Sequence, residues 1–154
     1  MADTIEERLA ALNLELPSPA APAANYAPFL INGPRLYVSG QLPVGPDGIA
    51  FHGHVGSDLD LDQAQQAARL CAINILAQAK AALGSLERID QCLKLGGFVS
   101  STPEFTDHPL VVNGASDLMV AVLGDKGRHT RFAVGASSLP LGAAVEVDAL
   151  FAIA

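Results

Sequence analysis

Hydrophobic residues along the chain recur at helical spacing in two long stretches. The clearer stretch begins after Asp58 or Asp60, either of which suits a helix N-cap, and extends to about Leu83. Gly84 follows directly and is a typical helix stop. The apolar positions share one face of this helix, and they are Leu61, Ala64, Ala68, Cys71, Ile75, Ala79 and Ala82. Because so many of them are small, we expect this helix to pack closely on a sheet.

Shorter apolar segments rich in β-branched and aromatic residues predict strands. Two of them flank the sequence Asn32-Gly33-Pro34, which is typical of a hairpin turn. The predicted strands cover 29–31, 35–40, 89–100, 131–136 and 144–153. The Gly96-Gly97 pair suggests a break or bulge inside the longest one.

The second helical stretch covers 110–123 and is followed by Gly124. The order of the predicted elements is helix, strands, long helix, strand, helix, strand, strand. This order favours an α+β fold, in which one largely antiparallel sheet carries two long helices on one face. With 154 residues and no repeat, the chain is expected to form a single domain over 1–154.

The first 25 residues are predicted to be an extension of this domain. Thr4 and Glu7 have the spacing of a capping box, and Ile5 begins a short amphipathic pattern. The segment 17–28 contains four prolines among alanines and should be extended. Tyr26 lies in this segment, where it either anchors the segment or lines a pocket.

Composition and charge narrow the function classes. The net charge is −7 and only nine residues are Lys or Arg, so nucleic acid is an unlikely partner. No apolar run is long enough for a membrane span, and the acidic N-terminus lacks a signal core, so we expect a cytoplasmic protein. No Walker loop, GxGxxG or metal-ligand pattern occurs, so no cofactor and no metal are expected. Cys71 and Cys92 are interpreted as small buried hydrophobes.

Two charges stand out in otherwise apolar predicted strands, namely Arg131 and Glu146. Buried charges are unfavourable unless they are paired. We expect the two residues to lie on neighbouring strands. Either they pair with each other or with neighbours, or they face a site for a charged ligand. An arginine fork matches a carboxylate with two parallel hydrogen bonds, and a carboxylate facing the same crevice could hold a water and move protons.

The residues around these charges resemble the signature of the Rid/YjgF family, the reactive-intermediate deaminases that are also named L-PSP endoribonucleases. The matching segments are T-R-F-A-V at 130–134, S-S-L-P at 137–140 and V-E-V at 145–147. Upstream, L-Y-V-S-G-Q-L-P at 36–43 is similar to the first hairpin of the family, and Asn113 falls where the family has an Asn in its second helix. The resemblance covers about Tyr26 to the C-terminus.

The resemblance implies a chorismate-mutase-like domain that assembles as a homotrimer with sites between subunits. It implies hydrolysis of small 2-imino acids to 2-keto acids and ammonia. Arg131 would clamp the substrate carboxylate, and Glu146 would position the attacking water. The backbone at Ser39 and Gly40 would contact substrate or water.

The remaining positions that the resemblance implies are more peripheral. Tyr26 would close the pocket and Asn113 would support it. The N-terminal extension and the entry G-R-H-T-R at 127–131 indicate a longer subgroup of the family. His129 or His108 either adds a group to the pocket or is an exposed loop histidine.

Other functions remain open at this stage. The same cleft could serve a non-catalytic regulator that binds small carboxylates. The older family name implies an endoribonuclease or translation inhibitor, which the acidic charge and the absence of a basic run disfavour. A purely structural or chaperone-like trimer is a further alternative.

Overall fold

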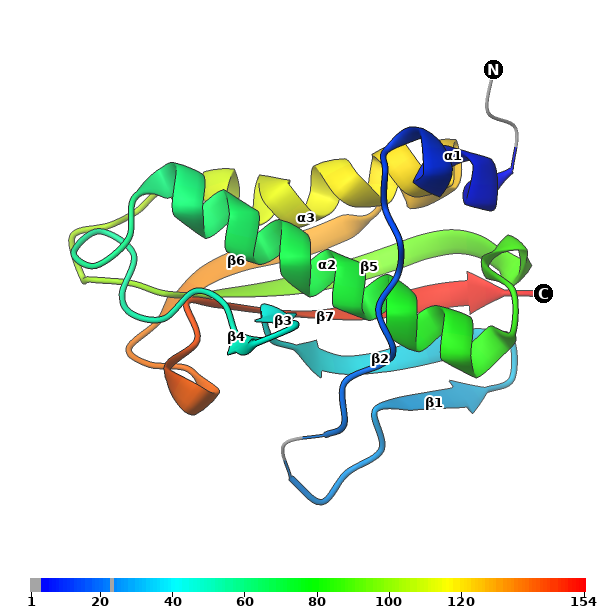
Figure 1. The fold of residues 1–154 in the computed structure, drawn as a ribbon, viewed down its shortest axis with the longest axis horizontal. Coiled ribbons are helices and arrows are strands. Elements are labelled where there is room, and N and C mark those ends of the chain that lie inside the picture. Colours follow the sequence, from blue (N-terminus) through cyan, green and yellow to red (C-terminus); the bar gives the residue numbers. More distant parts are fainter. Residues whose placement is uncertain (1–3, 23) are drawn as a thin grey trace.

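The computed structural model describes residues 4–22 and 24–154, and its main feature is one five-stranded sheet with helices on one face (Figure 1). The strand order is β1-β2-β7-β5-β6, and β3 and β4 form a separate small hairpin. The helices are α1 (Ile5–Ala11), α2 (Leu61–Leu83) and α3 (His108–Leu123). The strands are β1 (Phe29–Asn32), β2 (Arg35–Gln41), β3 (Val44–Gly45), β4 (Gly48–Ile49), β5 (Ile89–Ser100), β6 (Thr130–Ala136) and β7 (Val145–Ile153). The prediction of an α+β fold with two long helices on one face of the sheet is confirmed.

Strand direction follows from the connections. The hairpin at Gly33 makes β1 and β2 antiparallel, and β7 pairs antiparallel with both β2 and β5. The chain leaves β5, passes through α3 and returns to β6, so β5 and β6 are parallel. Both β1 and β6 are edge strands, at opposite sides of the sheet.

The core lies between the sheet and the two long helices. Alternate residues of β7 point to the helices and are buried, as a period of two requires. These are Val145, Val147, Ala149, Phe151 and Ile153. The residues between them, Glu146 and Asp148 among them, point to the other face, which no helix covers in Figure 1.

The predicted helix ends are largely confirmed. Asp60 forms a capping box with Gln63, and Gly84 adopts a left-handed conformation that ends α2. Gly124 ends α3, as predicted. However, α3 begins at His108, two residues earlier than expected, because Pro109 suits the first turn of a helix.

The predicted break at Gly96-Gly97 is wrong. Both glycines pair in regular register with β7, and the irregularities of β5 lie nearer its start, between Ile89 and Gln91 and between Cys92 and Lys94. The two glycines instead permit close packing. A Cβ on Gly97 would lie 2.6 Å from a methyl carbon of Val112 on α3.

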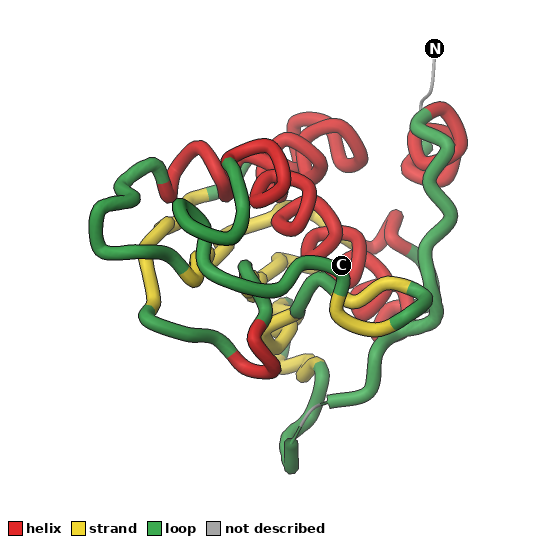
Figure 2. Tube along the Cα trace, turned by 60° about the vertical axis from the view of Figure 1, so that its left-hand side comes forward, coloured by secondary structure: helices red, strands yellow, loops and turns green. Residues whose placement is uncertain are grey.

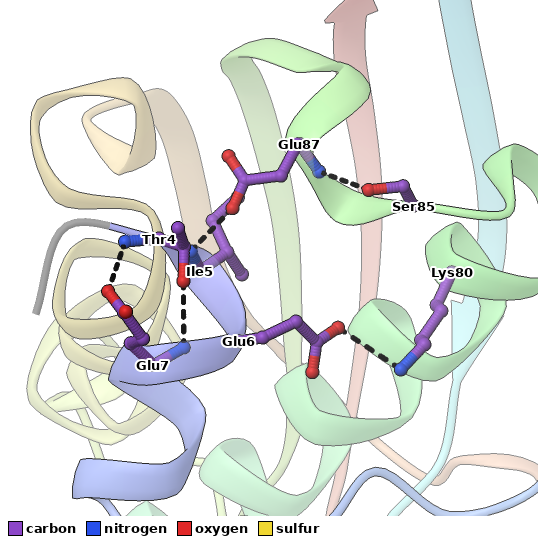
Figure 3. Close-up of polar contacts among 7 residues, drawn as sticks. All are labelled: Thr4, Ile5, Glu6, Glu7, Lys80, Ser85 and Glu87. Atoms are coloured by element: carbon purple, nitrogen blue, oxygen red, sulfur yellow. Dashed lines mark hydrogen bonds and ion pairs between the residues drawn. The ribbon is translucent and has the colours of Figure 1, made fainter.

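The N-terminal extension runs along the helix layer and then descends beside the end of the sheet (Figure 2). The predicted capping box of Thr4 and Glu7 is present in α1. Figure 3 shows how α1 is attached: Glu6 forms an ion pair with Lys80 at 3.1 Å, and the backbone N–H of Ile5 donates to Glu87 at 2.6 Å. After α1, the described residues of the proline-rich segment form neither helix nor strand, as predicted.

None of the helices in the described ranges is long and apolar enough to cross a membrane.

Candidate functional site

Arg131 lies on the edge strand β6 and points to the helix side of the sheet. It is level with the buried Leu95 of β5 in the parallel register. Its guanidinium donates to Ser116 Oγ at 3.1 Å and to the carbonyl oxygen of Pro109 at 3.0 Å, both on α3. Two neutral acceptors thus orient the guanidinium without neutralising its charge.

A histidine supports this arrangement through the same serine. His129 Nδ1 lies 2.6 Å from the carbonyl oxygen of Gly127, and Nε2 lies 2.8 Å from Ser116 Oγ. Because a carbonyl can only accept, Nδ1 donates a hydrogen to Gly127. Of the two histidines considered from sequence, His129 joins the Arg131 group. His108 instead pairs with Ser101 at 3.1 Å.

Asn113 belongs to the same face of α3 as the two partners of Arg131. Pro109 precedes it by four residues and Ser116 follows it by three, and residues at these spacings share one side of a helix. Asn113 is partly buried there. Sequence reasoning missed Ser116, although its helical spacing from Asn113 was a signal that could have identified it.

Glu146 lies on the central strand β7 and points to the face that carries no helices. It pairs with Phe98 of β5 and is partly buried. Burial raises the pKa of its carboxyl above the usual value, and the negative charge of Asp148 raises it further. The carboxylate packs directly on Gly40, where an added Cβ would collide with Glu146 Oε2. A side chain at position 40 would therefore require the Glu146 carboxylate to move.

The segment from Tyr26 to Gly40 completes this second group. The Ser39 hydroxyl donates to the carbonyl oxygen of Ala27 at 2.7 Å, and its backbone N–H donates to Pro28. Ser39 therefore fixes the segment that carries Tyr26. The ring of Tyr26 and the backbone of Gly40 both line a small cavity at the end of β2.

The prediction that Arg131 and Glu146 lie on neighbouring strands is wrong. Strand β5 lies between β6 and β7, and the two side chains point to opposite faces of the sheet. They are therefore not cross-strand partners. The structure separates an α3–β6 group, formed by Asn113 and Arg131, from a β2–β7 group, formed by Tyr26, Ser39, Gly40 and Glu146.

The charges of both groups have no counter-ion among residues 4–22 and 24–154. Among the described residues, neither the Arg131 guanidinium nor the Glu146 carboxylate takes part in an ion pair. A partly buried charge without a counter-ion is unfavourable, which indicates a bound ligand or a second chain as the missing partner.

The two cysteines are poor candidates for a nucleophile. Both are free and buried. Burial raises the pKa of the Cys92 thiol to about 12, and burial together with the charge of Glu146 raises that of Cys71 well above its usual value. In the part of the chain that the structure describes, no three His, Cys, Asp or Glu side chains are grouped in a way that could hold a metal ion.

The chain is similar to known proteins along almost its entire length. A family model described as "YjgF/chorismate mutase-like, putative endoribonuclease" matches residues 6–153. Protein TCP17 of Trypanosoma cruzi is 48% identical over 147 residues, which are 95% of this chain and 92% of that protein.

Solved structures agree with this match along almost the entire chain. Atu1372 of Agrobacterium tumefaciens is 55% identical with a TM-score of 0.92, covering 99% of this chain and 94% of that one. A "putative endoribonuclease" of Shewanella oneidensis is 36% identical with a TM-score of 0.95, covering 98% of this chain and 100% of that one. The chain belongs to the YjgF/chorismate mutase-like family.

Proposed function

We propose that the protein is an imine deaminase that hydrolyses small 2-imino acids to 2-keto acids and ammonia, at sites formed between the subunits of a homotrimer. One observation carries the proposal. Arg131 and Glu146 are both partly buried and unpaired, and they face away from each other within the chain. A second copy can join the α3–β6 group of one subunit to the β2–β7 group of the next.

The uncovered face of the sheet supports such an assembly. Large apolar side chains lie exposed there, with Tyr37 at 45%, Phe98 at 37% and Val134 at 42% exposure. Phe98 packs edge-on against Phe132, whose ring also lies near the ammonium group of Lys94. Exposed apolar surface of this kind is typical of a protein–protein contact.

The chemistry follows from the two charged groups. The Arg131 guanidinium would hold the substrate carboxylate in a bidentate pair and thereby place the imine carbon. The Glu146 carboxylate would take a proton from a water as the water oxygen bonds to that carbon. The same proton would then pass to the nitrogen of the tetrahedral intermediate. Glu146 would then move the proton of the remaining hydroxyl to the same nitrogen, so that the C–N bond breaks, ammonia leaves and the oxygen becomes the keto group.

The raised pKa of Glu146 suits this exchange of protons. A carboxylate whose pKa is raised is a stronger base, so it accepts the proton of a water more readily than an ordinary carboxylate does. Because position 40 has no side chain, the Glu146 carboxylate lies directly against the backbone of Gly40.

The test is hydrolysis of 2-iminopropanoate, generated in situ from alanine by an amino-acid oxidase. Release of ammonia is compared between the parent protein and the variants Arg131→Ala and Glu146→Gln, with circular dichroism as the control for folding. Folded variants that keep full turnover would exclude the assigned roles.

A non-catalytic regulator would use the same clamp. Calorimetry with 2-ketobutyrate, beside the hydrolysis assay, separates the two functions, because binding without turnover favours the regulator. The family description also names an endoribonuclease. The net charge of −7 does not favour an RNA surface, and RNA cleavage lost in Arg131→Ala or Glu146→Gln would be needed to support it.

A further inference from the structure

A small, partly open cavity lies between the N-terminal segment, the end of β2 and α2. Its volume is about 80 Å³. The residues that matter for its chemistry are Ala20, Tyr26, Gly40, Gln41, Gln78 and Leu141. Because Gly40 also contacts the Glu146 carboxylate, the cavity adjoins the β2–β7 group of the proposed deaminase site.

Gln78 of α2 gives this cavity an unused hydrogen-bond acceptor. The residue is 1% exposed, and its Nε2 donates to the carbonyl oxygen of Ala20 at 2.9 Å and, more weakly, to Gln41 Oε1 at 3.5 Å. Among the buried side-chain atoms of the described residues, Gln78 Oε1 has no hydrogen-bond partner. A buried carbonyl without a donor is unfavourable, so its retention calls for an explanation.

The orientation of the Gln78 amide is determined by its surroundings. Turning it over would place its oxygen against the Ala20 carbonyl oxygen, where two acceptors would repel. Nearby amides are satisfied: Gln41 Nε2 donates to the Ser39 carbonyl, and Asn74 Nδ2 donates to two carbonyls of the β2–β3 connection. The cavity therefore lacks one thing, a hydrogen-bond donor facing Gln78 Oε1.

The N-terminal segment that lines the cavity is attached to the rest of the chain on both sides of it. At its start, α1 is attached to α2 and to the turn before β5 by the contacts of Glu6 and Ile5 (Figure 3). At its end, the Ser39 hydroxyl holds the Ala27 carbonyl. The Ala20 carbonyl that orients Gln78 is therefore part of a fixed segment.

The size and charge of the cavity restrict what can enter. A volume near 80 Å³ admits only a few non-hydrogen atoms, since a water in the liquid occupies about 30 Å³. No Asp, Glu, Lys, Arg or His of the described chain lines it. A neutral hydroxyl or primary amide thus fits better than an ammonium group, which would be buried without a counter-ion.

We propose that this cavity receives the side chain of the imino acid, and that Gln78 Oε1 accepts a hydrogen bond from a hydroxyl or primary amide at its end. The inference rests on the proposed deaminase function and assigns its substrate class: 2-imino acids with short polar, uncharged side chains. Tyr26 and Gly40 line this cavity, and Gly40 also lies against the Glu146 carboxylate.

The test compares two substrates of equal shape. Homoserine and norvaline are each converted to the imino acid by an amino-acid oxidase, and they differ only in a terminal hydroxyl or methyl group. We expect kcat/KM to be about tenfold or more higher for the homoserine-derived imino acid, because a site built to bond a hydroxyl rejects an analogue that lacks it. Equal values would overturn the inference.

A variant of similar length isolates the acceptor. Gln78→Met should lose the preference and keep turnover of the norvaline-derived imino acid, whereas the matched control Gln66→Met, at an exposed position of α2, should keep the preference. If Gln78→Met does not fold, the ratio of the two kcat/KM values for the parent protein still tests the inference. If neither imino acid is hydrolysed, the deaminase proposal fails. Calorimetry with 2-keto-4-hydroxybutanoate and 2-ketopentanoate then tests separately whether the cavity prefers a terminal hydroxyl. Tighter binding of the hydroxyl compound supports it, and equal affinity overturns it.

Discussion

The α3–β6 group and the β2–β7 group hold charges of opposite sign in different ways. The Arg131 guanidinium has two neutral acceptors on α3 that hold it in place. The Glu146 carboxylate has a buried setting and the like charge of Asp148 beside it, and both raise its pKa. The positive charge is oriented, whereas the negative charge is made more ready to take up a proton.

The two groups would therefore have different roles in the proposed reaction. A clamp for a carboxylate needs a fixed direction and a permanent charge, which an oriented arginine provides. A group that accepts and returns protons needs an ionised form that is not too stable. Because the two groups lie on opposite faces of one sheet, each subunit would supply half of two different sites.

The largest expected effect is the loss and recovery of activity in mixed assemblies. Arg131→Ala and Glu146→Gln should each lower kcat/KM for 2-iminopropanoate by about 100-fold or more. Co-expressed in equal amounts, the two inactive variants should recover about a quarter of the parent activity, because some interfaces then combine an intact Arg131 with an intact Glu146. Ammonia release by the purified mixture measures this.

One result of the mixing experiment would contradict sites formed between subunits. If both residues act within the same subunit, no interface regains a complete site and the mixture stays inactive. The double variant Arg131→Ala/Glu146→Gln, mixed with either single variant, is the matched control and should recover nothing.

A smaller effect is expected from the support of Arg131. Ser116→Ala removes one acceptor of the guanidinium and should raise KM about tenfold with kcat within about twofold, because one hydrogen bond to a charged group is worth about 1.5–3 kcal/mol and water replaces part of it. Steady-state kinetics of ammonia release provide the measurement. Ser116→Thr restores the hydroxyl and should restore KM.

The chain offers a control of the same chemical kind. Ser101 also pairs with a histidine, His108, but makes no contact with Arg131. Ser101→Ala should leave KM unchanged. A similar rise of KM in both alanine variants would mean that general loosening, and not the orientation of Arg131, is responsible.

The elements of the fold could be predicted from sequence because their signals are local. The capping box at Asp60, the left-handed Gly84 and the alternation along β7 each depend on a few adjacent residues. The neighbours of a strand are not a local property. The sequence contains both Arg131 and Glu146, yet only the pairing of β5 between β6 and β7 determines that they face opposite ways.

The same limit explains which site residues could be found. Arg131 and Glu146 could be found because they interrupt apolar strands, and the family resemblance implied their roles. Ser116 and Gln78 were recognised only from their contacts across the fold. An amide in a helix is usually solvent-exposed and gives no signal in the sequence. Its burial at Gln78 depends on where the N-terminal segment crosses α2.

The smallest expected effect is on stability, and it concerns the charge of Glu146. Since the pKa of Glu146 is higher in the folded chain than in the unfolded one, its ionisation destabilises the fold. This destabilisation is absent below the unfolded pKa and is complete above the folded pKa. Glu146→Gln should therefore have a higher Tm than the parent at pH 7, with a gain that shrinks as the pH falls to about 4. Asp148→Asn, which removes only the like charge, should give a smaller gain. A gain of equal size at every pH would point to packing. A loss at pH 7 would mean that the ionised carboxylate stabilises the fold, which would contradict this assignment.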